Sequence, residues 1–173
     1  MPRIYLIILL SSALCGCATA PTAPPDSGPR APGNIYTLKS GEYKYPASGY
    51  LFAWPIKGDI ASSFGSKIGR IVNKGIDIKA NDGMNVHAAK AGRVVYCNRR
   101  LKGFGETVIL DHGNGYQTVY AYNSSIIAKI GDEVRQNDII AKAGRTGRAR
   151  GPMLHFEIRK DGEPQNPYYH LPH

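Results

Sequence analysis

The sequence predicts an all-β domain with largely antiparallel strands. Short apolar or alternating runs are separated by glycine and asparagine turns, and no stretch of about twelve residues carries a convincing helical stripe. Once the N-terminal segments are set aside, roughly 120 residues remain, enough for one domain with a hydrophobic core. A mixed α/β domain is the alternative, and the missing helical periodicity counts against it.

The runs expected to form strands follow one another along the chain. Several alternate apolar and polar residues or are rich in β-branched residues, which favours strands. In chain order they are residues 51–56, 75–79, 92–98, 106–111, 117–122, 139–143 and 154–159. Gly113-Asn114-Gly115 between two of these runs indicates a hairpin, and Asp161-Gly162 predicts a second turn.

The N-terminal segment predicts export. Residues 4–14 follow one basic residue, Arg3, and form an apolar run that is too short to span a bilayer but suits a secretory signal. The run ends in Leu14-Cys15-Gly16-Cys17, the pattern that bacterial lipoprotein processing reads. We therefore expect residues 1–16 to be a lipoprotein signal peptide and the Cys17 thiol to carry a diacylglycerol. An ordinary signal peptide cut at an Ala-x-Ala site is the alternative, and it leaves Cys17 unexplained.

Residue 18 bears on the destination of the lipoprotein. It is Ala18 and not Asp. By similarity to the sorting rules of Gram-negative bacteria, this favours a lipid-anchored protein on the periplasmic face of the outer membrane.

Residues 17–50 are expected to be the lipidated Cys and a proline-rich tether. The segment 18–34 holds five prolines among small polar residues, and it cannot bury enough apolar surface to fold. In polyproline form the tether could reach on the order of 100 Å. Residues 35–42 resemble the opening strand of a LysM glycan-binding repeat, but the rest of a repeat has no room before Trp54. A truncated remnant, or chance, is the favoured interpretation.

Cysteine usage agrees with this organisation. Cys15 should leave with the signal peptide and Cys17 should be lipidated, so Cys97 alone remains and no intrachain disulfide is expected in the mature chain. Cys97 lies in an apolar, strand-like run, which predicts a buried and inert thiol.

Three short segments resemble the active-site motifs of lysostaphin/LytM-type zinc endopeptidases, peptidase family M23. Residues 73–78 (NKGIDI) resemble its His-x-x-x-Asp segment, residues 120–123 (YAYN) its Tyr-Ala-His-Leu segment, and residues 153–157 (MLHFE) its His-x-His segment. Further short matches in the same order extend the resemblance over residues 51–171. The resemblance implies a largely antiparallel β-domain, residues 51–173, with a groove along one sheet.

The resemblance also implies which positions would carry the chemistry. In the active family two His and one Asp hold zinc, and those positions here are Asn73, Asp77 and His155. The two assisting His positions hold Tyr122 and Met153. An amide oxygen is a poor zinc ligand, and two remaining ligands seldom hold zinc. A thioether has no proton to transfer and a phenol is a weak base at neutral pH. We therefore expect no bound metal, no cofactor, no catalytic residue and no enzyme activity.

The other histidines do not rebuild a site. His112 lies in a turn that active relatives also carry, so a structural role is expected, and local hydrogen bonding or solvent exposure is expected for His87. His170 and His173 lie in the tail. None of them has ligand spacing to the zinc-ligand positions.

A groove that has lost its catalytic side chains is expected to bind a ligand instead of cleaving it. We predict that Asn73, Asp77, Tyr122, Met153 and His155 form the binding groove. Three arginines in a glycine-rich loop are candidates for its rim, namely Arg145, Arg148 and Arg150. Apolar anchors below and guanidinium groups above suit an acidic or amphipathic peptide. A solvated loop is the alternative for the arginines, and both interpretations stay open.

The charge balance is basic. The whole chain carries +9, and loss of Arg3 with the signal leaves 21 basic against 13 acidic residues, or +8. Such a chain suits work beside anionic polymers such as peptidoglycan or lipid headgroups. Nucleic acid is not expected as a partner, because the chain is predicted to be exported.

A lipoprotein signal, a tether and a degenerate LytM-type domain together resemble murein hydrolase activators of the NlpD/EnvC type. That resemblance implies an outer-membrane lipoprotein whose groove opens a periplasmic N-acetylmuramoyl-L-alanine amidase by an allosteric mechanism. The expected role is septal peptidoglycan splitting and cell separation. A passive peptidoglycan-binding lipoprotein and a zinc endopeptidase with an atypical site are the alternatives.

Overall fold

The computed structural model describes residues 51–173. The predicted signal peptide, the lipidation site Cys17, the tether up to residue 50 and the LysM-like segment 35–42 lie outside the described residues. Within the described range, no helix has the length and apolar character that crossing a membrane requires.

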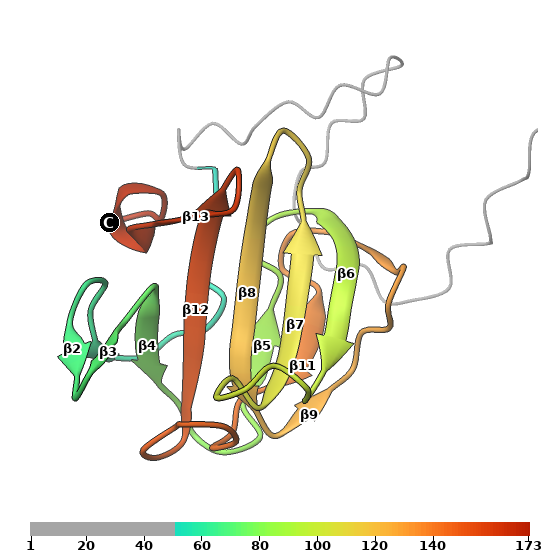
Figure 1. The fold of residues 1–173 in the computed structure, drawn as a ribbon. Coiled ribbons are helices and arrows are strands. Elements are labelled where there is room, and N and C mark those ends of the chain that lie inside the picture. Colours follow the sequence, from blue (N-terminus) through green and yellow to red (C-terminus); the bar gives the residue numbers. More distant parts are fainter. Residues whose placement is uncertain (1–50) are drawn as a thin grey trace, which may run out of the picture. The chain divides into compact units, whose positions relative to one another are not determined.

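A large sheet of antiparallel strands dominates the fold (Figure 1). Its strands are, in order across the sheet, β1 (Ile60–Ser62), β4 (Ile76–Lys79), β12 (Met153–Lys160), β8 (Tyr116–Asn123), β7 (Glu106–Asp111), β6 (Gly92–Asn98) and β10 (Glu133–Val134). β13 (Glu163–Gln165) pairs with the last residues of β12. The predicted all-β, largely antiparallel fold is confirmed.

Two smaller sheets complete the domain. β5 (Asn85–His87), β11 (Ile139–Lys142) and β9 (Ser125–Ile126) form one, in that order, and β2 (Lys67–Ile68) and β3 (Ile71–Val72) form the other. A single 3₁₀ turn, η1 (Pro167–Tyr169), is the one helical element of the described residues. The β2–β3 hairpin forms no backbone ladder with either of the other sheets.

The hydrophobic core lies between the large sheet and the three-stranded sheet. Val86 and Ile140 from the small sheet join Leu110 and Tyr120 from the large sheet in one fully buried cluster. Figure 1 shows β5 and β11 behind β8 and β7. One face of the large sheet is therefore covered, and the other face is free to form a site.

The alternation of β12 decides which residues reach that other face. Successive side chains of a strand point to opposite faces. Leu154, Phe156 and Ile158 are fully buried in the core. The residues between them, including His155 and Glu157, consequently lie on the face away from the core.

Most predicted strands match the observed ones. The runs 92–98 and 106–111 coincide with β6 and β7, and the other runs from residue 75 onward differ from their strands by one residue at one or both ends. The turn residues between β7 and β8 have positive φ, as has the pair Asp161-Gly162 between β12 and β13. Both hairpins are confirmed.

Residues 51–56 are a correction, because they form no strand. Pro55 has no N–H to donate to a ladder, and the segment is held by separate contacts instead. Ala53 N donates to Ala89 O over 2.7 Å, and Trp54 Nε1 donates to Pro172 O over 2.8 Å. Phe52 and Ile56 are buried all the same. The apolar composition of this run therefore indicates a buried segment and not a strand.

Cys97 is a second, smaller correction. It lies on β6 as predicted, but its side chain is partly buried and packs at the margin of the core. β6 is the second strand from one end of the large sheet, next to the short strand β10, so its outer side is only partly covered.

Candidate functional site

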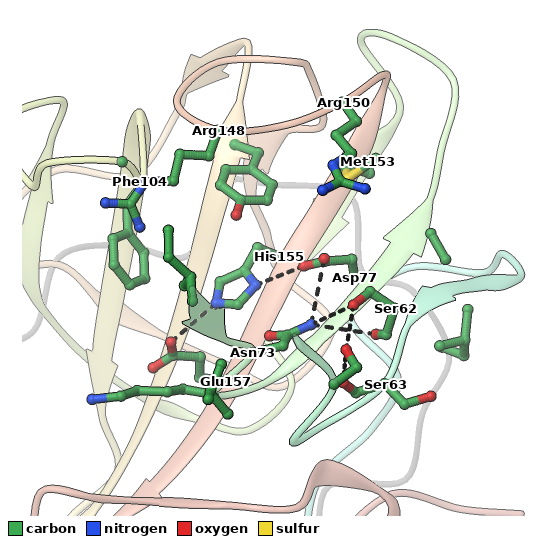
Figure 2. Close-up of a pocket in the computed structure, with 18 of the residues that line it drawn as sticks. Ser62, Ser63, Asn73, Asp77, Phe104, Arg148, Arg150, Met153, His155 and Glu157 are labelled. Carbon is green, nitrogen blue, oxygen red and sulfur yellow. Dashed lines mark hydrogen bonds and ion pairs between the residues drawn. The ribbon is translucent and has the colours of Figure 1, made fainter. Parts of the chain in front are cut away.

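A cavity of about 700 Å³ opens on the free face of the large sheet (Figure 2). It is lined by five residues of the predicted groove, namely Asn73, Asp77, Tyr122, Met153 and His155. Arg148 and Arg150 line it as well. Arg145 is exposed and does not belong to the lining. The structure thus brings together all the predicted positions except Arg145.

Strand register places the side chains of Asp77 and His155 side by side. Asp77 on β4 pairs with His155 on β12, and His155 pairs with Ala121 on β8. All three side chains point to the same face, since cross-strand partners share a face.

Both nitrogens of the His155 ring are bound to carboxylates. Nδ1 lies 2.7 Å from Asp77 Oδ1, and Nε2 lies 3.0 Å from Glu157 Oε1 (Figure 2). Carboxylates only accept, so both ring nitrogens donate when the ring is an imidazolium. Burial disfavours this cation, but the two carboxylates outweigh the desolvation and raise the pKa of His155 above its ordinary value.

Glu157 links the imidazole to an arginine. Its side chain is 1% exposed, and its Oε2 accepts from Arg159 Nε over 2.7 Å and from an Arg159 terminal nitrogen over 2.5 Å. Burial alone would raise the pKa of Glu157, yet the hydrogen bonds and charges of His155 and Arg159 lower it. The floor therefore contains two buried carboxyl groups bonded to one imidazole ring, with a guanidinium at one end.

Two aromatic rings flank the imidazole. The Phe104 and Tyr122 ring centroids lie 5.5 Å and 5.2 Å from that of His155. Tyr122 has φ = 69°, a left-handed conformation that a bulky residue rarely adopts. Strand alternation from Ala121 would turn Tyr122 towards the core, and the positive φ instead allows its ring to lie over the floor. Burial and the nearby Asp77 raise the pKa of Tyr122, so its phenol stays neutral at neutral pH.

The other end of the floor is closed by the Asn73 amide. Asn73 is 6% exposed, and its Oδ1 accepts from Gly75 N over 3.0 Å. Its Nδ2 donates to Ser62 Oγ over 3.0 Å and lies 3.4 Å from Asp77 Oδ2. The amide nitrogen, and not the oxygen, therefore faces the carboxylate.

His112 and His87 bond to partners outside the cavity. His112 Nδ1 bonds to Ala91 O over 2.8 Å and Nε2 to Thr118 Oγ1 over 2.7 Å, as its predicted structural role requires. His87 Nδ1 bonds to Asn137 O over 2.8 Å. Neither residue lines the cavity.

Comparison with known proteins identifies the fold. The model of peptidase family M23 matches residues 71–167, more than half of the chain. The chain belongs to this family. Its structure is similar to the catalytic domain of lysostaphin from Staphylococcus simulans, with a TM-score of 0.61 and 26% identity over 65% of this chain and 90% of that one.

Two relatives carry names that describe a role or a location. The chain is 39% identical over 119 residues to the murein hydrolase activator NlpD of Escherichia coli, covering 69% of the chain and 31% of the relative. It is 40% identical over 126 residues to the outer membrane antigenic lipoprotein B of Haemophilus influenzae, covering 73% of the chain and 30% of the relative. The chain thus spans about a third of the length of these curated relatives.

The residues of this M23 site do not fit the zinc ion that the resemblance implies. The Asn73 position presents an N–H₂ group to Asp77, where a ligand would present a lone pair. Both ring nitrogens of His155 are engaged with carboxylates. Within residues 51–173 there is no group of three or more His, Cys, Asp or Glu side chains that could hold a metal ion.

Sequence reasoning missed Glu157 and Arg159. Both were visible as part of the β12 run MLHFEIRK, in which every second residue from His155 onward is charged. Residues i, i+2 and i+4 of a strand share a face, so this pattern places His155, Glu157 and Arg159 in one row. Ser62 carried no comparable signal, because only the tertiary structure brings it to Asn73.

Thr146, in the loop that carries the rim arginines, links the start of β7 to the end of β8. Its Oγ1 accepts from Glu106 N over 3.0 Å and donates to Asn123 O over 2.7 Å. Arg148 N donates to Gly103 O over 2.9 Å close by. The wall that carries Phe104 and Arg148 is therefore tied to the end of β8.

Replacing Thr146 with Val is expected to lower the free energy of unfolding by about 1–3 kcal/mol, because it keeps the shape and leaves two backbone groups without their partner. Urea denaturation measures the change. Ser125→Ala, at an exposed hydroxyl on β9, is the matched control and should change stability by less than about 0.5 kcal/mol. Equal stability of Thr146→Val and the wild type would show that the Thr146 hydroxyl does not link β7 to β8.

Proposed function

We propose that this chain is a non-catalytic M23 lipoprotein of the outer membrane that activates a periplasmic N-acetylmuramoyl-L-alanine amidase. The observation that carries the proposal is the state of the groove floor. Asp77 and Glu157 are both bonded to His155, and Asn73 turns its amide nitrogen to Asp77, so the former catalytic groups satisfy one another. A floor that is internally paired can shape a binding surface but offers no free base or ligand to a reaction.

The walls of the groove supply what a docking surface needs. Ile71 and Val72 are 44% and 48% exposed and line one side of the cavity. Tyr122 and Met153 line it from the other strands, and Arg148 and Arg150 stand at its mouth without an ion pair in the described part of the chain. Apolar side chains below unpaired guanidinium groups suit an amphipathic segment with acidic residues.

The named relatives support this assignment. One is called a murein hydrolase activator and the other an outer membrane lipoprotein. The expected localisation, on the periplasmic face with the lipid on Cys17, is consistent with both names. As an activator the chain would favour the open amidase by binding it more tightly than the closed form, and so promote septal peptidoglycan splitting and cell separation.

The decisive experiment measures dye release from labelled sacculi by an amidase, with and without the purified chain. The chain should raise dye release by the amidase and should release none alone. Release by the chain alone that EDTA abolishes would establish the peptidase alternative. Binding of the chain to sacculi with no effect on the amidase would favour the passive module.

Tyr122→Ala should weaken stimulation, because it removes the aromatic surface at the centre of the groove. Truncation of an aromatic hot spot at the centre of an interface costs about 2 kcal/mol or more, so the concentration for half-maximal stimulation should rise about thirtyfold or more. Tyr169→Ala removes a tyrosine that is 80% exposed and outside the cavity, and it should leave stimulation unchanged. Equal effects of the two variants would show that the groove is not the contact surface.

A further inference from the structure

The Asn73 amide occupies a position where three oxygen atoms converge. Besides Ser62 Oγ at 3.0 Å and Asp77 Oδ2 at 3.4 Å, the Nδ2 atom lies 3.5 Å from Ser62 O. A carbonyl and a carboxylate can only accept, so the reverse amide orientation would place oxygen against oxygen. The N–H₂ group of Asn73 is therefore the donor that these three acceptors share.

These contacts reach the base of the β2–β3 hairpin. Ser62 Oγ bonds to Ser66 Oγ over 2.7 Å, and Ser66 lies immediately before β2. The backbone closes the same junction, because Gly65 N donates to Asn73 O and Asn73 N donates to Ser66 O, both over 2.8 Å. Figure 2 shows the side-chain links running from Glu157 through His155 and Asp77 to Asn73 and Ser62.

No strand of the other two sheets pairs with the hairpin. β2 and β3 pair only with each other, and the apolar side chains of β3, Ile71 and Val72, are among the most exposed large hydrophobics of the described residues. The Asn73 side chain bonds to Ser62 and lies 3.4 Å from Asp77, so its contacts lie where the hairpin joins the rest of the domain.

We propose that Asn73 is the positioning residue of the groove: its side-chain nitrogen cross-links Asp77 on β4 to Ser62 on β1, and so holds the wall formed by Ile71 and Val72. The groove then keeps its shape without a metal. The oxygen of the same amide serves a separate purpose, since it accepts from Gly75 N in the turn before β4. The two purposes can be separated by substitution.

Asn73→Asp separates them. It is nearly isosteric and keeps the oxygen that accepts from Gly75 N, but it replaces the donor nitrogen with a second acceptor. Amide hydrogen exchange of the full chain, followed by NMR in the presence of EDTA, gives the readout. The backbone amides of Gly65 and Asn73 should exchange about five- to tenfold faster in the variant, as loss of one hydrogen bond in a local opening predicts. Amides in the β7–β8 ladder supply the reference for global unfolding.

Asn85→Asp is the matched control, because Asn85 lies on β5 outside the cavity and its Oδ1 accepts from Lys142 Nζ. It should leave exchange at Gly65 unchanged. Asn73→Ala serves if the acidic variant does not fold, and the same acceleration is expected. Unchanged exchange at Gly65 in the folded Asn73 variant, relative to the β7–β8 reference, would overturn the proposal.

Zinc chloride alone provides the second arm. Added to the wild-type chain without EDTA, it should bind non-saturably and leave Gly65 exchange as it was. Saturable binding that slows this exchange would overturn the proposal, because a cation and not the amide would then be the cross-link. Neither arm uses an amidase, so failure here is distinguishable from failure of the proposed function.

Discussion

Glu157→Gln is expected to lower the free energy of unfolding by about 3–5 kcal/mol near pH 6, because it removes the buried charge that Arg159 and the His155 ring share. Glu157 bonds to His155 through one oxygen and to Arg159 through the other. The amide keeps the volume of the side chain, so the loss reports charge and hydrogen bonding and not a cavity. Urea denaturation with fluorescence detection measures it.

The pH dependence of this loss identifies its cause. The folded-state pKa of Glu157 lies below its ordinary 4.5, so its contribution is present above that pH and is lost as the pH falls through the folded value. The folded-state pKa of His155 lies above its ordinary 6.5, so its contribution is present below that pH and is lost as the pH rises through the folded value. The cost of Glu157→Gln should therefore be greatest between about pH 4.5 and 6.5.

Glu163→Gln makes the same chemical change on β13, where the side chain is exposed. It should alter stability by less than about 0.5 kcal/mol. A loss for Glu157→Gln as small as that of the control would mean that the buried ion pairs do not hold the floor together.

His112 is expected to make the domain less stable as the solution becomes acidic. Burial of its ring, helped by the charge of Lys90, lowers its pKa from 6.5 to about 4. Between these values the unfolded chain binds a proton that the folded chain does not. The free energy of unfolding should therefore fall as the pH drops, by about 1.4 kcal/mol per unit and about 3 kcal/mol in total.

The measurement compares wild type with His112→Asn over a series of pH values. Other groups titrate in the same range, so the difference between the two profiles isolates His112. The variant is expected to be less stable at neutral pH, since it loses bonds to Ala91 and Thr118 and the ring contact with Phe52. The difference in the free energy of unfolding between wild type and variant should narrow as the pH falls towards 4. Parallel profiles would contradict the buried, neutral state of this histidine.

Local sequence patterns were enough for the six longest strands of the described residues. Runs such as 92–98 and 106–111 carry the period and composition of strands, and glycine-rich turns with positive φ mark where they reverse. The segment 51–56 was misassigned because apolar composition signals burial whether or not the backbone joins a ladder. Short strands such as β9 and β10 contain too few residues to show a period.

For the candidate site, too, the sequence determined one part and the tertiary structure decided the other. The sequence by itself determined that Asn73, Tyr122 and Met153 stand at positions where the family resemblance calls for histidines, since residue identity needs no coordinates. Only the tertiary structure decided what the substituted site became. The bond between His155 and Asp77 joins residues 78 positions apart, and the direction of the Asn73 amide depends on Ser62 from another strand. Hydrogen-bond geometry between distant segments depends on sheet register and strand order, which no local pattern encodes.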